Sequence, residues 1–432
     1  MSNALIMMLA VMGGTMLLRA PISFGMLAGG VAYLIVKGQD VGLMAEQVLN
    51  GLYNSYVLLA VPLFILAASI MNAGAISERL FSMAIALVGH FRGGLAYVNV
   101  IVSVIFSGMS GSAIADAAGP GLVSIRMMTD KKRFSPEFAG ALTACSSTIG
   151  PIIPPSIPLV IYALVSGTSV GALFLAGVMP GFIMALALMI GIYILGRIHD
   201  FPREPRTPLK QLPKVLIEGF LPLTLPIVLL GGIYSGIFTP TEAAAVAAMH
   251  AILLTIYYRS LTWSRMWHVM QESLRQSASV TLIVASAFIM NYAIAAEQIP
   301  DLVAHWFTLH QFTKIEYLLL MNLIFLVLGC FLDTSTMLLV LIPLLLPATR
   351  AMGVDLVHFG VVVVVNMMIG LVTPPFGMLL FVINALTGTS LKGMIRESLP
   401  FMALLLIALL TITLVPQTVL WLPQSMGYVT TQ

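Results

Sequence analysis

Residues 150–156 read GPIIPPS, and residues 370–377 read GLVTPPFG. Each motif interrupts an apolar stretch, residues 138–166 and residues 356–387, that is long enough to cross a bilayer core of roughly 30 Å. Adjacent prolines remove backbone donors and clash with the preceding turn, so one helix must end before them and another must start after them. We therefore predict two broken transmembrane helices. Both motifs begin with a glycine and carry the proline pair at the same place, which indicates an internal repeat.

The composition sets the class of protein. Of the 432 residues, 59% are hydrophobic and 9% are charged, whereas roughly a quarter of an ordinary soluble domain is charged. The net charge is only +3, and the basic residues lie mostly in short loops, so the chain offers no basic face for nucleic acid. The sequence predicts an all-α polytopic membrane protein that does not bind nucleic acid.

Continuous apolar stretches predict the remaining transmembrane helices, at residues 4–18, 22–36, 53–73, 171–197, 217–237, 240–258, 276–297 and 397–422. The first stretch has no basic segment before it and no small-residue cleavage site after it, so we expect it to be retained rather than removed as a signal peptide. Two short amphipathic segments, residues 77–92 and 298–313, are predicted to lie along the membrane interface as arms.

Two other apolar stretches are interrupted midway by polar residues. Residues 94–128 contain SGMSGSAIADAAG at 107–119, and residues 315–350 contain DTST at 333–336. Each stretch is predicted to be a re-entrant helical hairpin whose tip is buried in protein or lines a wet cavity, since lipid cannot satisfy the freed backbone groups. Threading the chain this way places 17 of the 20 lysines and arginines on one side, which the positive-inside rule makes the cytoplasmic side.

The two halves of the chain match at a nearly constant spacing, the one that separates Gly150 from Gly370. Besides the proline pairs, matches at or next to that spacing join Pro21 with Pro240, Ile70-Met71-Asn72 with Ile289-Met290-Asn291, His90 with His310, Ile149-Gly150 with Ile369-Gly370, Pro180 with Pro400, and Gly167-Thr168-Ser169 with Gly388-Thr389-Ser390. Each half has an odd number of crossings, so the second must be upside down relative to the first. This is an inverted-topology repeat, a feature typical of secondary transporters.

The predicted division of the chain follows from the repeat. The first repeat, 1–197, contains scaffold helices at 1–73, an arm at 77–92, a hairpin at 94–128, a broken helix at 138–166 and a helix at 171–197. A cytoplasmic linker, 198–214, joins it to the second repeat, 215–432, with scaffold helices at 217–258, a helix at 276–297, an arm at 298–313, a hairpin at 315–350, a broken helix at 356–387 and a helix at 397–422.

The hairpin tips and the helix breaks are the candidate binding sites. Unwound carbonyls with Ser and Thr hydroxyls form an oxygen cage suited to Na⁺, and half-helix N-termini suit an anion. The serines of the first tip could instead be small residues at a helix contact. Asp333 and Asp116 are carboxylates within the membrane, where a functional role is the default, although Asp116 could cap the returning helix. For Glu242, in the first turn of a helix, a structural role is the favoured interpretation. His250 is expected to be a hydrogen-bonded core histidine.

Several motifs together resemble the large membrane subunit, the DctM type, of tripartite ATP-independent periplasmic (TRAP) transporters. The residues that carry this resemblance extend over nearly the whole chain: Val61-Pro62-Leu63-Phe64 through Asn72-Ala73-Gly74, Ser110-Gly111-Ser112-Ala113 with Asp116, Gly150-Pro151-Ile152-Ile153-Pro154-Pro155-Ser156, Phe238-Thr239-Pro240-Thr241-Glu242-Ala243 and Gly370-Leu371-Val372-Thr373-Pro374-Pro375. The resemblance implies an elevator-type ion-transporter architecture, in which a transport domain moves against a scaffold.

The resemblance also implies binding residues. A first sodium site would use Ser107, Ser110, Gly150, Ile153 and Pro154, and a second would use Gly329, Gly370, Thr373 and Phe376. Substrate would contact Ser112, Ser156 and Asp333 between the two ions. No enzymatic activity and no cofactor other than Na⁺ as the coupling ion are expected. The chain has no GxxxxGK[ST] phosphate loop, so an ion gradient rather than ATP should supply the energy.

The implied partners are a small four-helix membrane subunit and a periplasmic substrate-binding protein that delivers an organic anion to the bacterial inner membrane. Because the chain starts directly with the first span of the repeat, we expect the small subunit to be a separate polypeptide. Selectivity would rest largely on the binding protein, so C4-dicarboxylates, sialic acid, sugar acids and keto acids are all compatible with this sequence.

Two other functions compete with this interpretation. One is a self-sufficient Na⁺/anion symporter of the same architecture that needs no binding protein. The other is an intramembrane serine protease, because Gly108-Met109-Ser110-Gly111 reads as a GxSG nucleophile motif. A protease would need a histidine within hydrogen-bond reach of Ser110, and His250 is the candidate by depth in the membrane.

Overall fold

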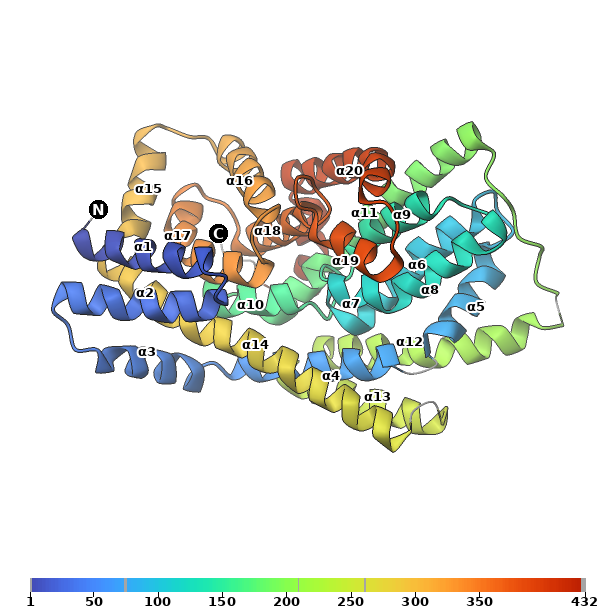
Figure 1. Ribbon diagram of the computed structural model, residues 1–432, viewed down its shortest axis with the longest axis horizontal. Coiled ribbons are helices and arrows are strands. Elements are labelled where there is room, and N and C mark those ends of the chain that lie inside the picture. Colours follow the sequence, from blue (N-terminus) through green and yellow to red (C-terminus); the bar gives the residue numbers. More distant parts are fainter. Residues whose placement is uncertain (1, 74–75, 209, 260–261, 429–432) are drawn as a thin grey trace.

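The computed structural model describes residues 2–73, 76–208, 210–259 and 262–428, without the side chains of residues 76–78. Regular structure within these ranges is helical (Figure 1). Seven of the described helices are long and apolar enough to cross a membrane. The chain is an all-α, multi-pass membrane protein, as its composition predicts.

The helices of the first half end at the linker between α11 and α12. In chain order they are α1 (Asn3–Leu17), α2 (Ile22–Lys37), α3 (Gly42–Tyr53), η1 (Tyr56–Leu59), α4 (Ala60–Ala73), α5 (Ile76–Val88), α6 (Gly94–Ser110), α7 (Ala113–Ala118), α8 (Pro120–Thr129), η2 (Asp130–Lys132), α9 (Pro136–Ser147), α10 (Ile157–Ser166) and α11 (Val170–His199). Gly74, the last residue of one family motif, lies outside the described residues.

The helices of the second half begin after the linker. They are α12 (Leu212–Tyr234), α13 (Pro240–Tyr257), α14 (Trp263–Ala296), α15 (Ile299–Leu309), α16 (Lys314–Gly329), α17 (Thr334–Ala351), α18 (Leu356–Gly370), α19 (Met378–Thr387), α20 (Leu391–Leu414) and α21 (Gln417–Ser425).

Helices end and restart at the interruptions that the sequence indicates. The chain leaves α9 at Ser147 and re-enters a helix at Ile157, and it leaves α18 at Gly370 and re-enters a helix at Met378. Both proline pairs in these breaks have cis peptide bonds. The chain also turns after α6, at Gly111, whose φ of +60° lies in the left-handed region that glycine enters without steric cost. From there α7 and α8 lead back against α6.

Three helices differ from the prediction. α14 begins at Trp263 rather than near residue 276, because its first turns carry charged residues that lower hydropathy without disfavouring a helix. α3 was not expected, since its mixed composition resembles neither a span nor a loop. The predicted span 397–422 divides into α20 and α21 before Pro416, which cannot continue the hydrogen-bond ladder.

Contacts between the two halves come in matched pairs. By the sequence spacing, α2 is equivalent to α13 and α4 to α14. α2 packs on α14, and in the same way α13 packs on α4. In the same way α9 packs on α20 and α18 on α11, while α10 packs on α17 and α19 on α7 and α8. The helix that follows each break, α10 or α19, therefore packs against the helix that follows the tip in the other half, α17 or α7 and α8.

Matched hydrogen bonds occur within the halves as well. Asn99 Nδ2 on α6 donates to Thr143 Oγ1 on α9, 44 residues along the chain, at 3.2 Å. Asn366 Nδ2 on α18 donates to the backbone oxygen of Asn322 on α16, also 44 residues away, at 2.8 Å. Buried polar bonds of this kind stabilise helix pairs in membranes. In each half they join the helix before the tip to the first part of the broken helix.

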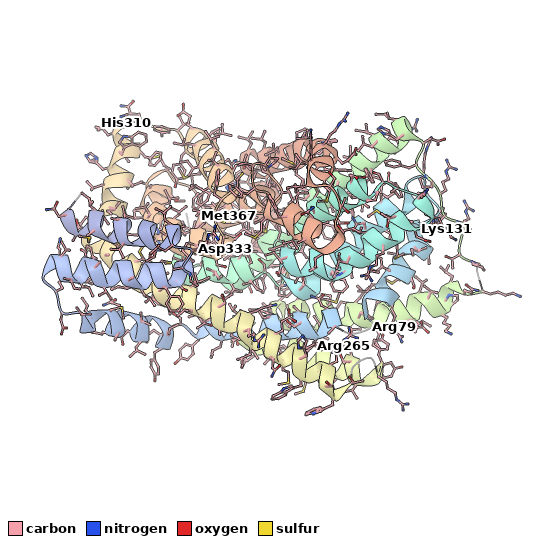
Figure 2. The ribbon with its side chains drawn as sticks, viewed as in Figure 1. Arg79, Lys131, Arg265, His310, Asp333 and Met367 are labelled. Carbon is pink, nitrogen blue, oxygen red and sulfur yellow. The ribbon has the colours of Figure 1, made fainter. Side chains whose placement is uncertain are left out.

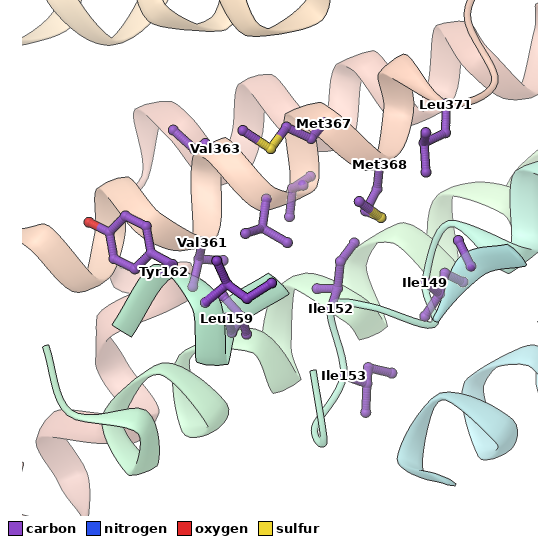
Figure 3. Packing of buried hydrophobic residues seen from close by; sticks show 14 of the residues in the cluster. Ile149, Ile152, Ile153, Leu159, Tyr162, Val361, Val363, Met367, Met368 and Leu371 are labelled. Atoms are coloured by element: carbon purple, nitrogen blue, oxygen red, sulfur yellow. The ribbon is translucent and has the colours of Figure 1, made fainter. Parts of the chain in front are cut away.

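The interior between the halves is tightly packed around the breaks. Figure 3 shows Ile152 and Leu159 of the first half with Val361 and Met368 of α18. The ring of Tyr162 lies directly against Gly360, where no side chain would fit, and its hydroxyl donates to the Leu356 carbonyl at 2.6 Å. This packing brings the two breaks close together.

Candidate functional site

A cavity of about 650 Å³ lies where the tips and the breaks of both halves meet. Its walls come from residues 110–115 with Ala118 and Gly119, from Pro151, Ile157 and Pro158, from residues 333–335, and from Met368, Leu371 and Met378. The opposite wall is formed by α4 and by the first part of α14. Figure 2 shows Asp333 near the centre of the molecule in this view, far from the ends marked by His310 and Lys131. A volume of this size suits a small organic ligand.

Four helices begin at this cavity. Ala113 opens the short α7, Ile157 and Pro158 open α10, Thr334 and Ser335 open α17, and Met378 opens α19. The N-terminus of a helix carries a partial positive charge, so these ends favour an anion. None of the described residues that line the cavity is Lys, Arg or His. The helix ends are therefore its positive groups.

The substrate residues suggested by the sequence separate into two groups. Ser112 and Asp333 line the cavity, and each also begins a helix: the Ser112 hydroxyl accepts from Ala115 N, and Asp333 Oδ2 accepts from Ser335 N at 2.9 Å. Ser156 is fully buried and is not among the lining residues. Its hydroxyl donates to the Pro151 carbonyl and accepts from Leu159 N, so it shapes the break and the start of α10.

The first predicted ion site gathers around a carboxyl group. The Ser110 hydroxyl donates to Asp116 Oδ1, and Asp116 Oδ2 lies against Gly150, where a Cβ would collide with it. Asp116 is only 2% exposed, and its Oδ2 has no hydrogen-bond partner. Ser107 is buried one turn earlier on α6 and donates to the Val104 carbonyl at 2.5 Å. Ser110 and Gly150 thus lie on the two oxygens of the buried Asp116 carboxyl group, and the oxygen beside Gly150 lacks a partner.

Other members of this predicted site lie close by. A Cβ on Gly108, next to Ser107, would be 3.9 Å from the Pro154 carbonyl. The side chain of Ile153 points away and packs against Gly181 on α11, so only its backbone could face an ion.

Sequence reasoning undervalued Asp116. Ser112, not Asp116, is the N-cap of α7, so the alternative role as a helix cap does not apply. The cost of a carboxyl group at membrane depth made Asp116 a functional candidate in the sequence, and the serine six residues before it is the further signal that could have placed it with the first ion site.

The second predicted ion site rests on a close backbone approach. A Cβ on Gly370 would be 2.8 Å from the carbonyl carbon of Gly329, so α16 and α18 touch at these glycines. Thr373 lies just beyond, and its hydroxyl donates to the Ile369 carbonyl at 2.7 Å. Phe376 is 55% exposed, with its ring 5.3 Å from that of Phe331.

A buried hydroxyl without a hydrogen-bond partner lies at the equivalent sequence position of the second half. Thr336 is related to Asp116 by the same spacing that relates Gly370 to Gly150. It is 5% exposed, and its Oγ1 has no hydrogen-bond partner. Each tip therefore has one buried oxygen without a partner at the equivalent position, a carboxylate in one half and a hydroxyl in the other. Oxygen groups of this type bind hard cations.

The remaining polar candidates have structural partners. Glu242 forms a capping box with Thr239 at the start of α13, which confirms its structural role. His250 Nε2 is hydrogen-bonded to Thr224 Oγ1 at 2.9 Å, whereas Ser110 is bonded to Asp116. The pair that a serine protease would need is not formed.

Known proteins resemble this chain closely. The family described as the tripartite ATP-independent periplasmic transporter, DctM component, matches residues 6–418. The sialic acid TRAP transporter large permease protein SiaM of Vibrio cholerae is 41% identical, over 96% of this chain and 97% of the relative. The C4-dicarboxylate TRAP transporter large permease protein DctM of Pseudomonas aeruginosa is 38% identical, over 93% and 94%. The solved YdaH transporter of Alcanivorax borkumensis has a similar fold, with a TM-score of 0.61 and 14% identity over 86% of each chain.

Proposed function

The chain belongs to the DctM family of TRAP transporters, whose named members are large permeases rather than enzymes, and from this membership we propose that it carries an organic carboxylate anion across the bacterial inner membrane together with Na⁺. The observation that supports this most directly is the cavity between the two tips, with helix N-termini on its wall and a cluster of buried oxygens beside each break. Two relatives are named for sialic acid and for C4-dicarboxylates, and both compounds are organic carboxylates. We therefore take organic carboxylates as the substrate class.

Sodium would occupy the two oxygen clusters. In the first, Ser107, Ser110, Asp116 and the carbonyls around Gly150 and Pro154 offer hydroxyl, carboxylate and backbone oxygens. In the second, the backbone of Gly329 and Gly370 would act with Thr373 and with the free hydroxyl of Thr336. Bound Na⁺ would add positive charge beside a cavity whose described lining has no basic side chain, and so would favour the anion.

The substrate would lie between these ions. Its carboxylate would face the starts of α10, α17 and α19, whose partial positive charge favours an anion. Ser112 and Asp333 would bind its hydroxyl groups, and Ser156 would act through the shape of the break rather than by contact.

The architecture supports an elevator motion. We take the matched contacts between helices of the two halves as the packing of an inverted-topology repeat with two re-entrant hairpins. The tips and breaks would form the moving part, with the substrate held against it, and the wall of α4 and α14 would belong to the scaffold. The two arms, α5 and α15, would connect them.

The partners follow from the family name. A small four-helix membrane subunit would complete the scaffold in the lipid bilayer, and a periplasmic substrate-binding protein would deliver the anion. A self-sufficient symporter differs only in not requiring that binding protein, so one experiment separates the two.

Uptake by proteoliposomes tests the proposal. Vesicles that contain this chain and its small partner should accumulate a carboxylate only when an inward Na⁺ gradient and a loaded binding protein are both present. The panel of C4-dicarboxylates, sialic acid, sugar acids and keto acids would identify the substrate. Uptake that does not change when the Na⁺ gradient is removed would contradict the coupling, and uptake from free substrate would favour the self-sufficient symporter.

Two substitutions of Asp333 should distinguish the role of its charge from its role as a helix cap. Asp333→Asn keeps an oxygen for Ser335 N and Thr336 N, so we expect normal stability but a loss of uptake of about tenfold or more, equivalent to ~1.4 kcal/mol. Asp333→Ala should also lower the free energy of unfolding by about 1 kcal/mol, because the cap is lost. Thermal unfolding and initial uptake rates measure the two effects. Full uptake by Asp333→Asn would show that the charge of this residue is not needed for transport and that its role is to cap α17.

A further inference from the structure

A second cavity, of about 670 Å³, lies at the end of the molecule where the linker meets the arm α5. It is bounded by the turn between α5 and α6, by the last turns of α11, and by the linker residues that follow. In Figure 1 this linker runs along the right-hand end, away from the central cavity. The site described above uses none of these residues.

The walls of this second cavity are held in place by backbone hydrogen bonds. Gly93 N donates to the Pro202 carbonyl at 2.9 Å, and Glu204 N donates to the Gly89 carbonyl at 3.1 Å. The ring of Phe201 packs between Phe134 and Phe138, at 5.0 Å from each. The linker is therefore attached to the α5–α6 turn, and the cavity does not depend on a free loop.

The charges in this region do not balance. Arg92, Arg197, Arg203 and Arg206 all line the cavity. The two acidic residues of the adjoining segment are already paired, since Asp200 binds Arg92 and Glu204 binds Arg133 at 3.1 Å. Among the described residues, Arg197, Arg203 and Arg206 form no ion pair. The Nε of Arg92 is buried without an acceptor.

The opposite wall of this cavity is apolar and aromatic. It is lined by Val88 of α5, Phe91 of the following turn, Ile101 of α6 and Met189 of α11. Tyr97 and Tyr193 lie between the apolar and the basic walls, and the Arg197 guanidinium stands 4.9 Å from the centre of the Tyr193 ring. Tyrosines at this position are typical of the membrane interface. A ligand that fills this cavity must therefore have an anionic group for the arginines and an apolar group for the opposite wall.

We propose that this cavity binds the headgroup of an anionic glycerophospholipid from the cytoplasmic leaflet. The phosphate oxygens would bind the guanidinium groups of Arg197, Arg203 and Arg206, and the first part of the acyl chains would lie on Val88 and Phe91. A soluble phosphate ester would use only the basic wall. The lipid would join the arm α5 to the linker between the halves, and this role is independent of which substrate is carried.

Lipid binding can be measured on the full chain purified with its small membrane subunit. In nanodiscs of phosphatidylcholine, titration with phosphatidylglycerol should fill one site that native mass spectrometry detects. Arg203→Gln with Arg206→Gln should weaken that binding about thirtyfold. Arg203→Lys with Arg206→Lys, which keeps the charge, should restore most of it. Arg265→Gln with Arg396→Gln removes two exposed arginines outside the cavity and should leave binding unchanged.

Two results would overturn the proposal. Equal binding of phosphatidylglycerol by the Arg203→Gln, Arg206→Gln variant and the unaltered protein would show that the lipid lies elsewhere. Competition by glycerol phosphate or inorganic phosphate at concentrations equal to the lipid would identify a site for a soluble phosphate and reject the lipid. Because both arginines are exposed and form no described ion pair, the variants should elute and unfold like the unaltered protein.

Discussion

Replacing Gly370 with alanine should reduce sodium-driven uptake about tenfold or more, which corresponds to ~1.4 kcal/mol or more. The added Cβ would lie 2.8 Å from the carbonyl carbon and 2.9 Å from the Cα of Gly329, and backbone atoms cannot move aside as the end of a side chain can. The helices α16 and α18 would have to separate at the proposed second sodium site. Affinity for Na⁺ should fall with uptake.

The same substitution at Gly329 is the matched control. A Cβ there would be 3.4 Å from the Cα of Gly370 and 3.6 Å from Met367, which are ordinary contacts. Gly329→Ala should therefore retain most uptake, although the two glycines touch each other. Uptake as a function of Na⁺ concentration, and the shift in melting temperature on adding NaCl, measure the difference. If Gly370→Ala transports normally, or if both variants fail equally, the close approach is not what the site requires.

Asp116→Asn should raise the Na⁺ concentration for half-maximal uptake roughly ten- to hundredfold. Asparagine has the same shape as aspartate, and its oxygen can still accept from Ser110. The atom beside Gly150, where the unpartnered Oδ2 lies, then becomes an amide nitrogen; if the amide is turned round, it is an uncharged oxygen. In either orientation a cation loses a charged ligand. Stability should change little, because the only described hydrogen bond of this side chain is kept.

Glu272→Gln is the control for this experiment. Glu272 lines the central cavity, is exposed and has Gln276 as its described hydrogen-bond partner, so the change removes the same charge without affecting either oxygen cluster. Its half-saturating Na⁺ concentration should match that of the unaltered protein. An unchanged Na⁺ dependence in Asp116→Asn would exclude this carboxylate from the ion site.

Features of the fold with a local cause could be predicted from the sequence. Paired prolines end helices whatever surrounds them, so both breaks lie where GPIIPPS and GLVTPPFG place them. Capping residues act within four positions, so the structural role of Glu242 followed from Thr239 and Pro240. In contrast, the start of α14 depends on propensity and tertiary packing, and hydropathy alone placed it about thirteen residues too late.

The candidate site was predictable to the extent that it follows the repeat. The constant spacing between the halves identified Gly370 and Gly150 as equivalent, and the structure places each against the tip of its own half. It did not show that Asp116 turns back to Ser110 and Gly150, because the direction of a side chain depends on the turn at Gly111. Nor could it show that Ser156 points into the break instead of the cavity, which requires the path of residues 151–156.

The absence of basic side chains among the described residues of the central cavity constrains the order of events in a transport cycle. An anion that arrived first would meet the carboxylates of Asp333 and Glu272 with only helix ends to hold it. Sodium should therefore bind before the substrate and should leave after it. With the Na⁺ coupling proposed above, such a carrier should not move the anion alone, and the stoichiometry of the cycle would be protected by what its binding site lacks.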